Sequence, residues 1–145
     1  MPGAISPRLA EIVAALPLAP EANVLEIGCG PGAAARAVAA RLTSGRILAI
    51  DRSATAIAQA KISGLEEIAS GRMSVRHIAA EDFVLEPGDA AFDIAFAVRV
   101  GALDGRHPAA GQVVLERIAA VLAPGGRLFV DGGQPLREIP LSPIR

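Results

Sequence analysis

The sequence predicts an α/β fold built on a doubly wound, mostly parallel sheet. Segments with strand character alternate with helical segments along the chain, and two of the strands, residues 45–51 and 91–98, are almost continuously apolar. The alternation implies right-handed crossovers between parallel strands. Continuous apolar strands are typical of the centre of such a sheet, which is buried on both faces. At 145 residues, a single domain spanning residues 1–145 is expected.

Local patterns then place the elements in chain order. Ser6 and Pro7 have the residue types of a helix start, so a first helix is expected within residues 1–20. Further helices are expected at about 32–42, from 54 through 61, and from 108 onward; strands are expected at 23–28, 45–51, 73–79, 91–98 and 127–131. Three prolines after Asp131 favour a short irregular tail, residues 132–145. The sheet is therefore expected to be truncated after about five strands.

Composition excludes several functional classes. The net charge of −1 and the pI of about 6.1 leave no basic excess for a nucleic-acid surface. The single cysteine excludes an intramolecular disulfide framework, and no Cys/His cluster has the spacing of a zinc site, so no metal is expected. No signal peptide or uninterrupted apolar run of about 20 residues is recognisable. We expect a soluble cytoplasmic protein without a nucleic-acid or membrane partner.

The stretch "VLEIGCGPG", residues 24–32, combines a carboxylate in a buried strand with three glycines at alternate positions. A glycine turn between a strand and a helix is typical of nucleotide-binding sites, and "GCGPGA" fits the dinucleotide fingerprint. Asp51, at the end of the next strand, suits the two hydroxyls of a ribose. For the glycines alone, a tight turn without a ligand remains an alternative. For Asp51, the alternative is that it only flanks the start of the next helix and binds no ligand.

Glu26 distinguishes two nucleotide ligands. A dinucleotide places its pyrophosphate at the helix start, where a carboxylate would repel it. A ligand with an ammonium group would instead make the same carboxylate useful. S-adenosylmethionine carries an ammonium, a sulfonium and a ribose, and it has no phosphate. Glu26 therefore favours S-adenosylmethionine over NAD, and it would either supply negative potential to the ligand or hold the loop.

These motifs resemble those of the class I S-adenosylmethionine-dependent methyltransferases over about residues 23–131. "VLEIGCGPG" is similar to their first motif and "ILAIDRS" to their second, while "AAEDF" resembles the loop that meets adenine. "FDIAFAVRVGAL" resembles their fourth strand and its loop, and "LERIAAVLAPGGRLFVD" the unit that follows. The resemblance implies a Rossmann-like fold, S-adenosyl-L-methionine as the cofactor, and methyl transfer to a small-molecule acceptor.

The resemblance also implies a set of cofactor-binding residues. The loop glycines would shape the methionine and ribose pocket, and Asp51 would bind the ribose. Arg52 would lie along the adenine near the Ala80 backbone, and either Glu81 or Asp82 would accept from the adenine amino group. The full set is Glu26, Gly28, Gly30, Gly32, Asp51, Arg52, Ala80, Glu81, Asp82 and Ala97.

No catalytic residue is assigned from the sequence, because methyl transfer from an activated sulfonium needs mainly alignment and water exclusion. Cys29 is expected to fill the glycine turn rather than act as a nucleophile. His107 is expected to be a surface residue at a helix start, with a general base as the alternative. Arg99 could face an anionic substrate.

Two other functions stay open: a non-catalytic S-adenosylmethionine-binding subunit and, with less support, an NAD-binding oxidoreductase domain. The non-catalytic subunit is considered because the family usually continues after its fifth strand with a helix and two antiparallel strands, and the 14 residues after Asp131 are too few to form them.

An uncovered fifth strand would expose unpaired backbone groups at the edge of the sheet. We expect a homodimer that covers this edge, and the alternative is a tail that folds back over it.

Overall fold

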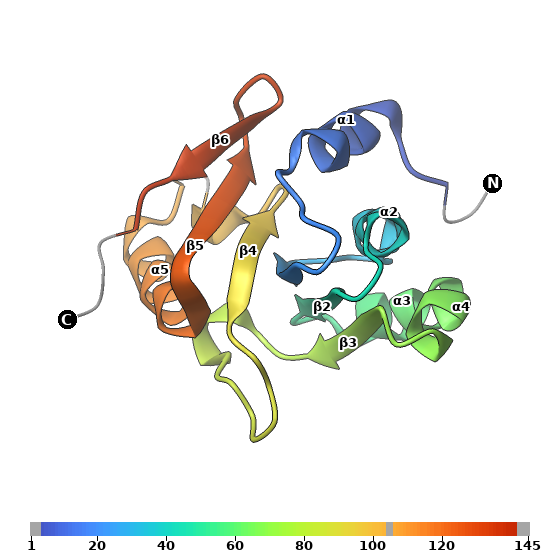
Figure 1. The fold of residues 1–145 in the computed structure, drawn as a ribbon. Helices are drawn as coiled ribbons and strands as arrows, with labels where there is room; N and C mark the ends of the chain where they lie inside the picture. Colours follow the sequence, from blue (N-terminus) through green and yellow to red (C-terminus); the bar gives the residue numbers. More distant parts are fainter. Residues whose placement is uncertain (1–3, 104–105, 142–145) are drawn as a thin grey trace.

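A computed structural model describes residues 4–103 and 106–141 as one six-stranded sheet with helices against both faces (Figure 1). The strand order is β3-β2-β1-β4-β5-β6, and every pairing is parallel except the antiparallel pairing of β5 with β6. The strands are β1 (Asn23–Ile27), β2 (Arg46–Asp51), β3 (Met73–His77), β4 (Phe92–Ala97), β5 (Leu122–Asp131) and β6 (Leu136–Ile139). The predicted Rossmann-like, mostly parallel fold is confirmed.

The helices are α1 (Pro7–Ala15), α2 (Ala33–Arg41), α3 (Ala54–Ser63), α4 (Leu65–Ala69) and α5 (Pro108–Val121), with short 3-10 turns η1 (Ala80–Asp82) and η2 (Gly101–Leu103). Helices α1, α3 and α5 begin where the sequence predicts, whereas α4 was not predicted. The Ser6 hydroxyl accepts from the Leu9 N–H at 3.2 Å, and the Ser53 hydroxyl accepts from the Ala56 N–H at 3.1 Å. Among the described residues, no helix is long and apolar enough to cross a membrane.

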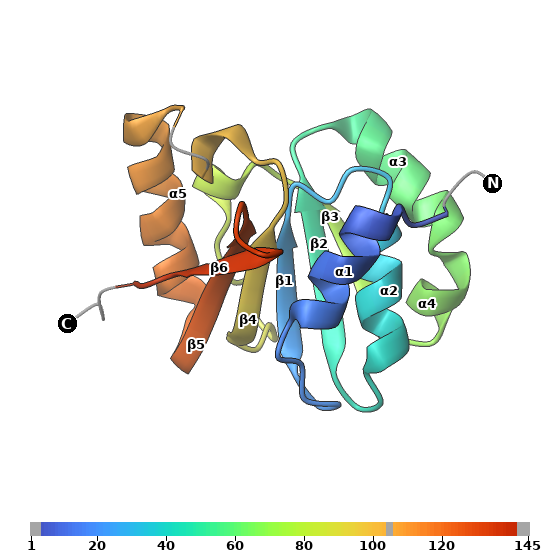
Figure 2. The same cartoon turned by 90° about the horizontal axis from the view of Figure 1, so that it is seen from above.

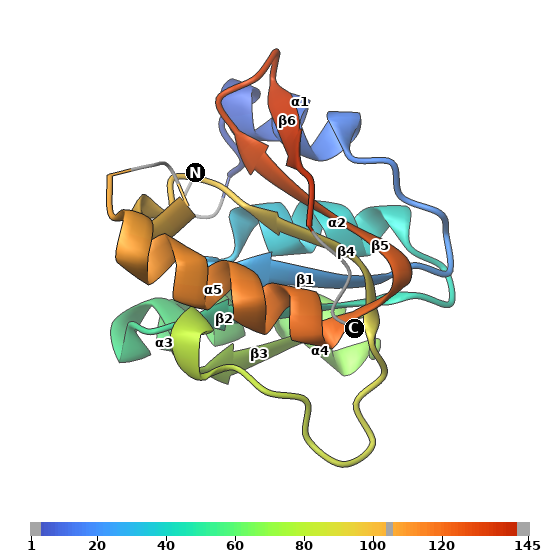
Figure 3. The same ribbon diagram turned by 90° about the vertical axis from the view of Figure 1, so that its left-hand side faces the viewer.

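The alternating side chains of the strands form two cores. Helices α1 and α2 lie side by side on one face of the sheet (Figure 2), and α5 lies on the other face (Figure 3). Val24 belongs to the core under α1 and α2, whereas Leu25 and Ile27 belong to the core under α5. Because side chains two apart in a strand share a face, Glu26 points to the same side as Val24. Glu26 therefore lies beneath α1 and α2, at the end of β1 that leads into the glycine loop.

The segment after β5 differs from the prediction. It was expected to be irregular, but residues 136–139 form β6, which pairs along β5 from Leu128 opposite Ile139 to Asp131 opposite Leu136. Pro135 and Pro140 flank this strand instead of interrupting it, so they do not prevent the pairing. The expectation that the sheet ends at an uncovered β5 edge is wrong, and the alternative of a tail folding back over that edge is confirmed.

The stretch "PGG", residues 124–126, lies inside β5 and interrupts its pairing. Phe92 lies opposite Leu122, but Ile94 lies opposite Arg127, so the pairing of β5 with β4 skips residues 123–126. Gly125 in this excursion has a φ of +79°, a conformation that favours glycine. The regular ladder resumes at Arg127, where the fifth strand was predicted to begin.

Candidate functional site

The glycine loop between β1 and α2 makes a tight turn under the start of α1. Gly28, Gly30 and Gly32 have φ values of +71°, +54° and +93°, which only glycine adopts without strain. Their surroundings differ. A Cβ at Gly32 would lie 3.2 Å from the Cβ of Ala60, whereas a Cβ at Gly30 would have no described atom within 4 Å. Gly32 therefore packs against α3, while Gly30 leaves room for a ligand.

Asp51 joins the end of β2 to the glycine loop. Its Oδ2 accepts a hydrogen bond from the Gly30 N–H at 2.9 Å, and its Oδ1 accepts from the Ser53 N–H at 2.8 Å. These bonds fix the carboxylate at the carboxyl ends of two adjacent parallel strands, which is where ligands bind in open α/β sheets. Each oxygen keeps a further lone pair, so Asp51 can still accept from a ligand hydroxyl.

Glu26 is buried next to this loop, with only 3% of its surface exposed. Burial, and secondarily the nearby charge of Asp51, raises the pKa of its carboxyl to about 8. Its Oε1 has no hydrogen-bond partner within the part of the chain that the structure describes. A buried carboxyl oxygen without a partner is energetically costly, so this group is the strongest single indication of a ligand-binding site.

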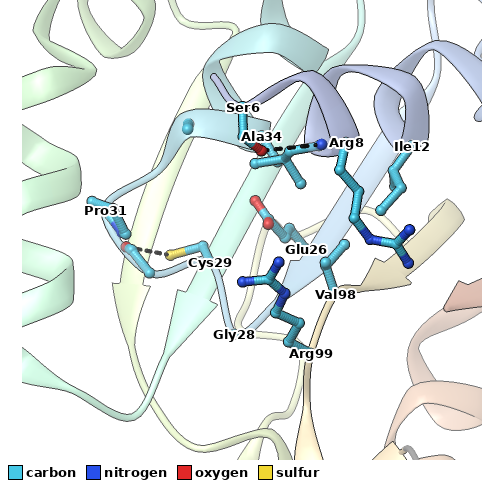
Figure 4. A pocket seen from close by; sticks show the side chains of 13 residues that line it. Ser6, Arg8, Ile12, Glu26, Gly28, Cys29, Pro31, Ala34, Val98 and Arg99 are labelled. Atoms are coloured by element: carbon cyan, nitrogen blue, oxygen red, sulfur yellow. Dashed lines mark hydrogen bonds between the residues drawn. The ribbon is translucent and has the colours of Figure 1, made fainter. Parts of the chain in front are cut away.

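Two neighbouring cavities lie beside these residues. The smaller, about 200 Å³, is called here the α1 pocket, and Figure 4 shows it from close by. It is lined by Ser6, Arg8, Leu9, Ile12, Glu26, Gly28, Cys29, Gly30, Pro31, Ala33, Ala34, Val98 and Arg99. The larger, about 520 Å³, is called the α5 cavity and is lined by Ile27, Gly28, Asp51, Arg52, Ala80, Glu81, Arg99, Val100, Gly101, His107, Ala110 and Val114. The two share Gly28 and Arg99, so they lie next to each other.

The structure brings most of the residues expected from the sequence to this site. Glu26, Gly28 and Gly30 line the α1 pocket, and Gly28, Asp51, Arg52, Ala80 and Glu81 line the α5 cavity. Gly32, Asp82 and Ala97 line neither. Gly32 packs on α3, Asp82 is exposed to solvent, and Ala97 is buried in the core. Of the two candidate adenine acids, Glu81 is thus the one at the cavity.

The sequence reasoning did not identify the contribution of α1. Ser6, Arg8, Leu9 and Ile12 close one side of the α1 pocket, and no motif links them to the glycine loop. Their position follows from tertiary contacts, since the Arg41 side chain in α2 donates to the backbone carbonyls of Val13 and Leu16 at the end of α1.

Arg99 was noted from the sequence only as a residue that could face an anion. The structure places it after β4 with a φ of +58°, unusual for a residue other than glycine. Its N–H donates to Oδ1 of Asp131 at 3.1 Å, which anchors this backbone between the two cavities.

The other candidate reactive groups behave differently. Cys29 is buried, and burial together with the charges of Glu26 and Asp51 raises the pKa of its thiol to about 12, which opposes a nucleophilic role. His107 lines the α5 cavity, where it could meet an acceptor substrate. Nε2 of His77 lies 2.9 Å from the carbonyl oxygen of Arg52, outside both cavities.

Comparisons with known proteins identify the family. Residues 24–126 match the family described as "Methyltransferase domain", and the chain belongs to this family. It is 31% identical over 122 residues to the trans-aconitate 2-methyltransferase of Delftia acidovorans, covering 84% of this chain and 42% of that protein. It is 33% identical over 129 residues to the protein of the same name from Methylobacterium nodulans, covering 89% and 45%. The chain thus spans less than half the length of these curated relatives.

Solved structures share the fold. A methyltransferase from Geobacter sulfurreducens, solved in complex with S-adenosyl-L-homocysteine, matches with a TM-score of 0.68 and 27% identity, over 88% of this chain and 48% of that one. The [4+2]-cyclase SpnF matches with a TM-score of 0.69 and 31% identity, over 85% and 43%. By their names, proteins similar to this chain include a methyltransferase and a cyclase.

Proposed function

We propose that this chain binds S-adenosyl-L-methionine and transfers its methyl group to a small-molecule acceptor. One observation carries the proposal. Two acidic side chains, Glu26, whose Oε1 lacks a partner among the described residues, and Asp51 at the end of β2, line two neighbouring cavities that share Gly28 and Arg99. The first suits a cationic ligand group and the second a pair of ribose hydroxyls.

The lining residues suit the parts of this cofactor. Glu26 would pair with the ammonium in the α1 pocket, where Gly30 leaves space. In the α5 cavity Asp51 would accept from the ribose, Arg52 would lie along the adenine, and Glu81 would accept from the adenine amino group. The Arg117 side chain donates to the Glu81 carbonyl at 3.1 Å, which holds η1 in place for this contact. The bound S-adenosyl-L-homocysteine of the Geobacter sulfurreducens relative supports the same ligand class.

The methyl transfer itself requires few catalytic groups from the protein. A lone pair of the acceptor attacks the methyl carbon, the carbon–sulfur bond breaks, and its electron pair stays on sulfur to leave S-adenosylhomocysteine. The chain would align the two reactants and exclude water. His107 lines the α5 cavity and would take the proton of an acceptor that must lose one. The names of the curated relatives make trans-aconitate the first acceptor to test.

Thermal shift followed by turnover tests this proposal. S-adenosylmethionine and S-adenosylhomocysteine should raise the melting temperature by binding the folded state. NAD should not, because its pyrophosphate offers Glu26 no ammonium with which to pair. The variant Asp51→Asn should reduce the shift. Stabilisation by NAD alone would indicate the oxidoreductase alternative.

Release of S-adenosylhomocysteine with trans-aconitate, or with another small acid from a panel, would then establish methyl transfer. Cofactor binding without turnover on any acceptor would favour the non-catalytic subunit. Conversion of an acceptor without consumption of the cofactor would indicate chemistry of the kind named for SpnF.

The cellular setting is part of the proposal. A cytoplasmic location without a nucleic-acid partner remains the expectation from composition, and cell fractionation would test the location.

The expected homodimer no longer has an uncovered β5 edge to support it, because β6 occupies that edge. Light scattering over a concentration series would show whether another surface forms a dimer.

A further inference from the structure

We propose that this chain forms a homodimer through an exposed apolar stripe on α3 and α4, which packs in parallel against the same stripe of a second copy. Both helices pack against β3, so the contact lies at the opposite end of the sheet from the β5 edge at which a dimer was first expected. The inference goes beyond the proposed function, because no residue of the stripe lines the α1 pocket or the α5 cavity.

The first observation is the spacing of the exposed residues along α3 and α4. Gly64 separates the two helices, but the Gly64 N–H donates to the Ala60 carbonyl at 2.9 Å and the Ile68 N–H donates to the Gly64 carbonyl at 2.8 Å. Hydrogen bonds of helical spacing thus cross the break, and α3 leads directly into α4 at the side of the molecule (Figure 2). Five exposed residues recur along them at alternating intervals of three and four: Thr55, Ala58, Ile62, Leu65 and Ala69. This is the a and d spacing of a coiled-coil seam.

The second observation is that the stripe faces away from the protein's own core. Ile57 and Ala60 are the buried residues of α3, and the helical period places them on the opposite side from Ala58 and Ile62. Ile62 and Leu65, in the middle of the stripe, keep 72% and 66% of their surface exposed. Large apolar side chains that adjoin on an exposed helix face are typical of an interaction surface.

The third observation, the charges beside the stripe, indicates what covers it. Lys61 and Glu66 flank the stripe on its two sides, at the g and e positions of the heptads in which Ile62 is a and Leu65 is d. In two parallel helices in register, a g residue lies beside the e residue five positions later in the other helix. Lys61 of each copy would therefore meet Glu66 of the other. Among the described residues, neither side chain forms an ion pair, so both charges are available to a second copy.

The same charges determine the orientation of the two copies. A two-fold axis parallel to the helices makes both Lys61–Glu66 contacts equivalent, as an isologous dimer requires. Antiparallel packing would place g positions beside g positions and e positions beside e positions, so Lys61 would not meet Glu66. The parallel pair is therefore the arrangement that matches apolar and charged groups in one contact.

The length of the stripe limits the affinity. Residues 55–69 span about 21 Å at 1.5 Å per residue, so the contact belongs to the small interfaces, below about 1,200 Å². We expect a dissociation constant on the order of 100 μM and a monomer at low micromolar concentrations. Unfolding measurements at those low concentrations therefore report the monomer.

Sedimentation equilibrium of the full chain, from about 5 to about 500 μM, tests this contact with five variants. Lys61→Glu and Glu66→Lys each place like charges across the contact, and a double variant carries both changes. Ile62→Glu places a charge in the middle of the stripe. Val113→Glu is the matched control, because Val113 is also a large apolar side chain exposed on a helix, but it lies on α5. Circular dichroism establishes that each variant is folded.

The unmodified chain should dimerise, and Val113→Glu should do so with a dissociation constant within about threefold of it. Each single charge reversal should weaken self-association about tenfold, and Ile62→Glu should abolish it. The double variant should recover the original affinity within about threefold. An equimolar mixture of Lys61→Glu and Glu66→Lys should form a heterodimer, because one copy then carries two carboxylates and the other two ammonium groups at the facing positions. A folding defect would not be repaired by mixing.

Other results would overturn the proposal. A monomer at every concentration would remove the dimer, and a dimer that Ile62→Glu leaves intact would place the contact elsewhere. Failure of the mixture to associate would refute the parallel pairing of Lys61 with Glu66. Loss of the dimer in Val113→Glu alone would move the contact to α5. None of these results bears on the proposed function, because cofactor binding is measured separately on the monomer at low concentration.

Discussion

Replacing Glu26 by Gln should stabilise the unliganded protein increasingly as the pH rises. Burial raises the pKa of the Glu26 carboxyl from 4.5 to about 8 in the folded chain. The folded state therefore retains a proton that the unfolded chain releases between these two values. Folding stability contributed by this group is fully present below pH 4.5 and is lost as the pH rises through 8. Glutamine cannot ionise and does not suffer this loss.

The magnitude follows from the size of the pKa shift. At about 1.4 kcal/mol per unit, a shift of roughly 3.5 units corresponds to roughly 5 kcal/mol. This is a large fraction of the total stability of a domain of this size, although relaxation and water entry around the charged carboxylate reduce it. We expect the difference in unfolding free energy between Glu26→Gln and the unmodified chain to grow by several kcal/mol from pH 5 to pH 9.

Urea unfolding at pH 5, 7 and 9 measures this difference, and comparison at each pH cancels the titration of the remaining groups. The control variant is Glu66→Gln, because Glu66 is exposed on α4 and lies away from both cavities. Its effect should be small and independent of pH. A difference for Glu26→Gln that is equally independent of pH would refute the inference that burial raises the pKa of this carboxyl.

Further predictions concern the loop and its neighbours. Asp51→Ala should weaken S-adenosylmethionine about tenfold or more in calorimetry; unchanged affinity in a folded variant would remove the ribose assignment. Gly30→Val should abolish cofactor binding, because the side chain fills the open space and strains a φ of +54°. Gly32→Ala should instead destabilise the fold by about 1–2 kcal/mol, and the folded fraction should bind the cofactor with an affinity within about threefold of the unmodified chain. Cys29→Ala should retain turnover, and complete loss of turnover with normal cofactor binding would restore a nucleophilic role.

Much of the fold could be predicted because its signals are local. The Ser6 and Ser53 caps, the apolar strands and the glycine turn each depend on residues close together in the sequence, and the structure has the corresponding elements. Glu26 and Asp51 could be recognised for a related reason. A charge at the end of an apolar strand is unusual on any reading of the chain, so its position alone indicates a site.

The remaining features depend on contacts between distant residues. β6 was not predicted, because three prolines in a short tail disfavour a strand and only the pairing with β5 shows that two of them flank it. The place of Arg8 in the α1 pocket depends on how α1 packs on α2. Gly32 resembles its neighbouring glycines in sequence, and only its distance of 3.2 Å to Ala60 separates a packing role from a ligand-binding one.

The most direct test of the whole account is the number of protons released when S-adenosylmethionine binds at pH 7. Calorimetry in two buffers with different ionisation enthalpies measures this number. With a pKa of about 8, Glu26 is mostly protonated before binding, and pairing with the ammonium requires its charged form. We predict binding with the release of close to one proton, and binding of 5′-methylthioadenosine with none. Tight binding of S-adenosylmethionine without proton release would contradict the role of Glu26, and no binding at all would contradict the proposed function.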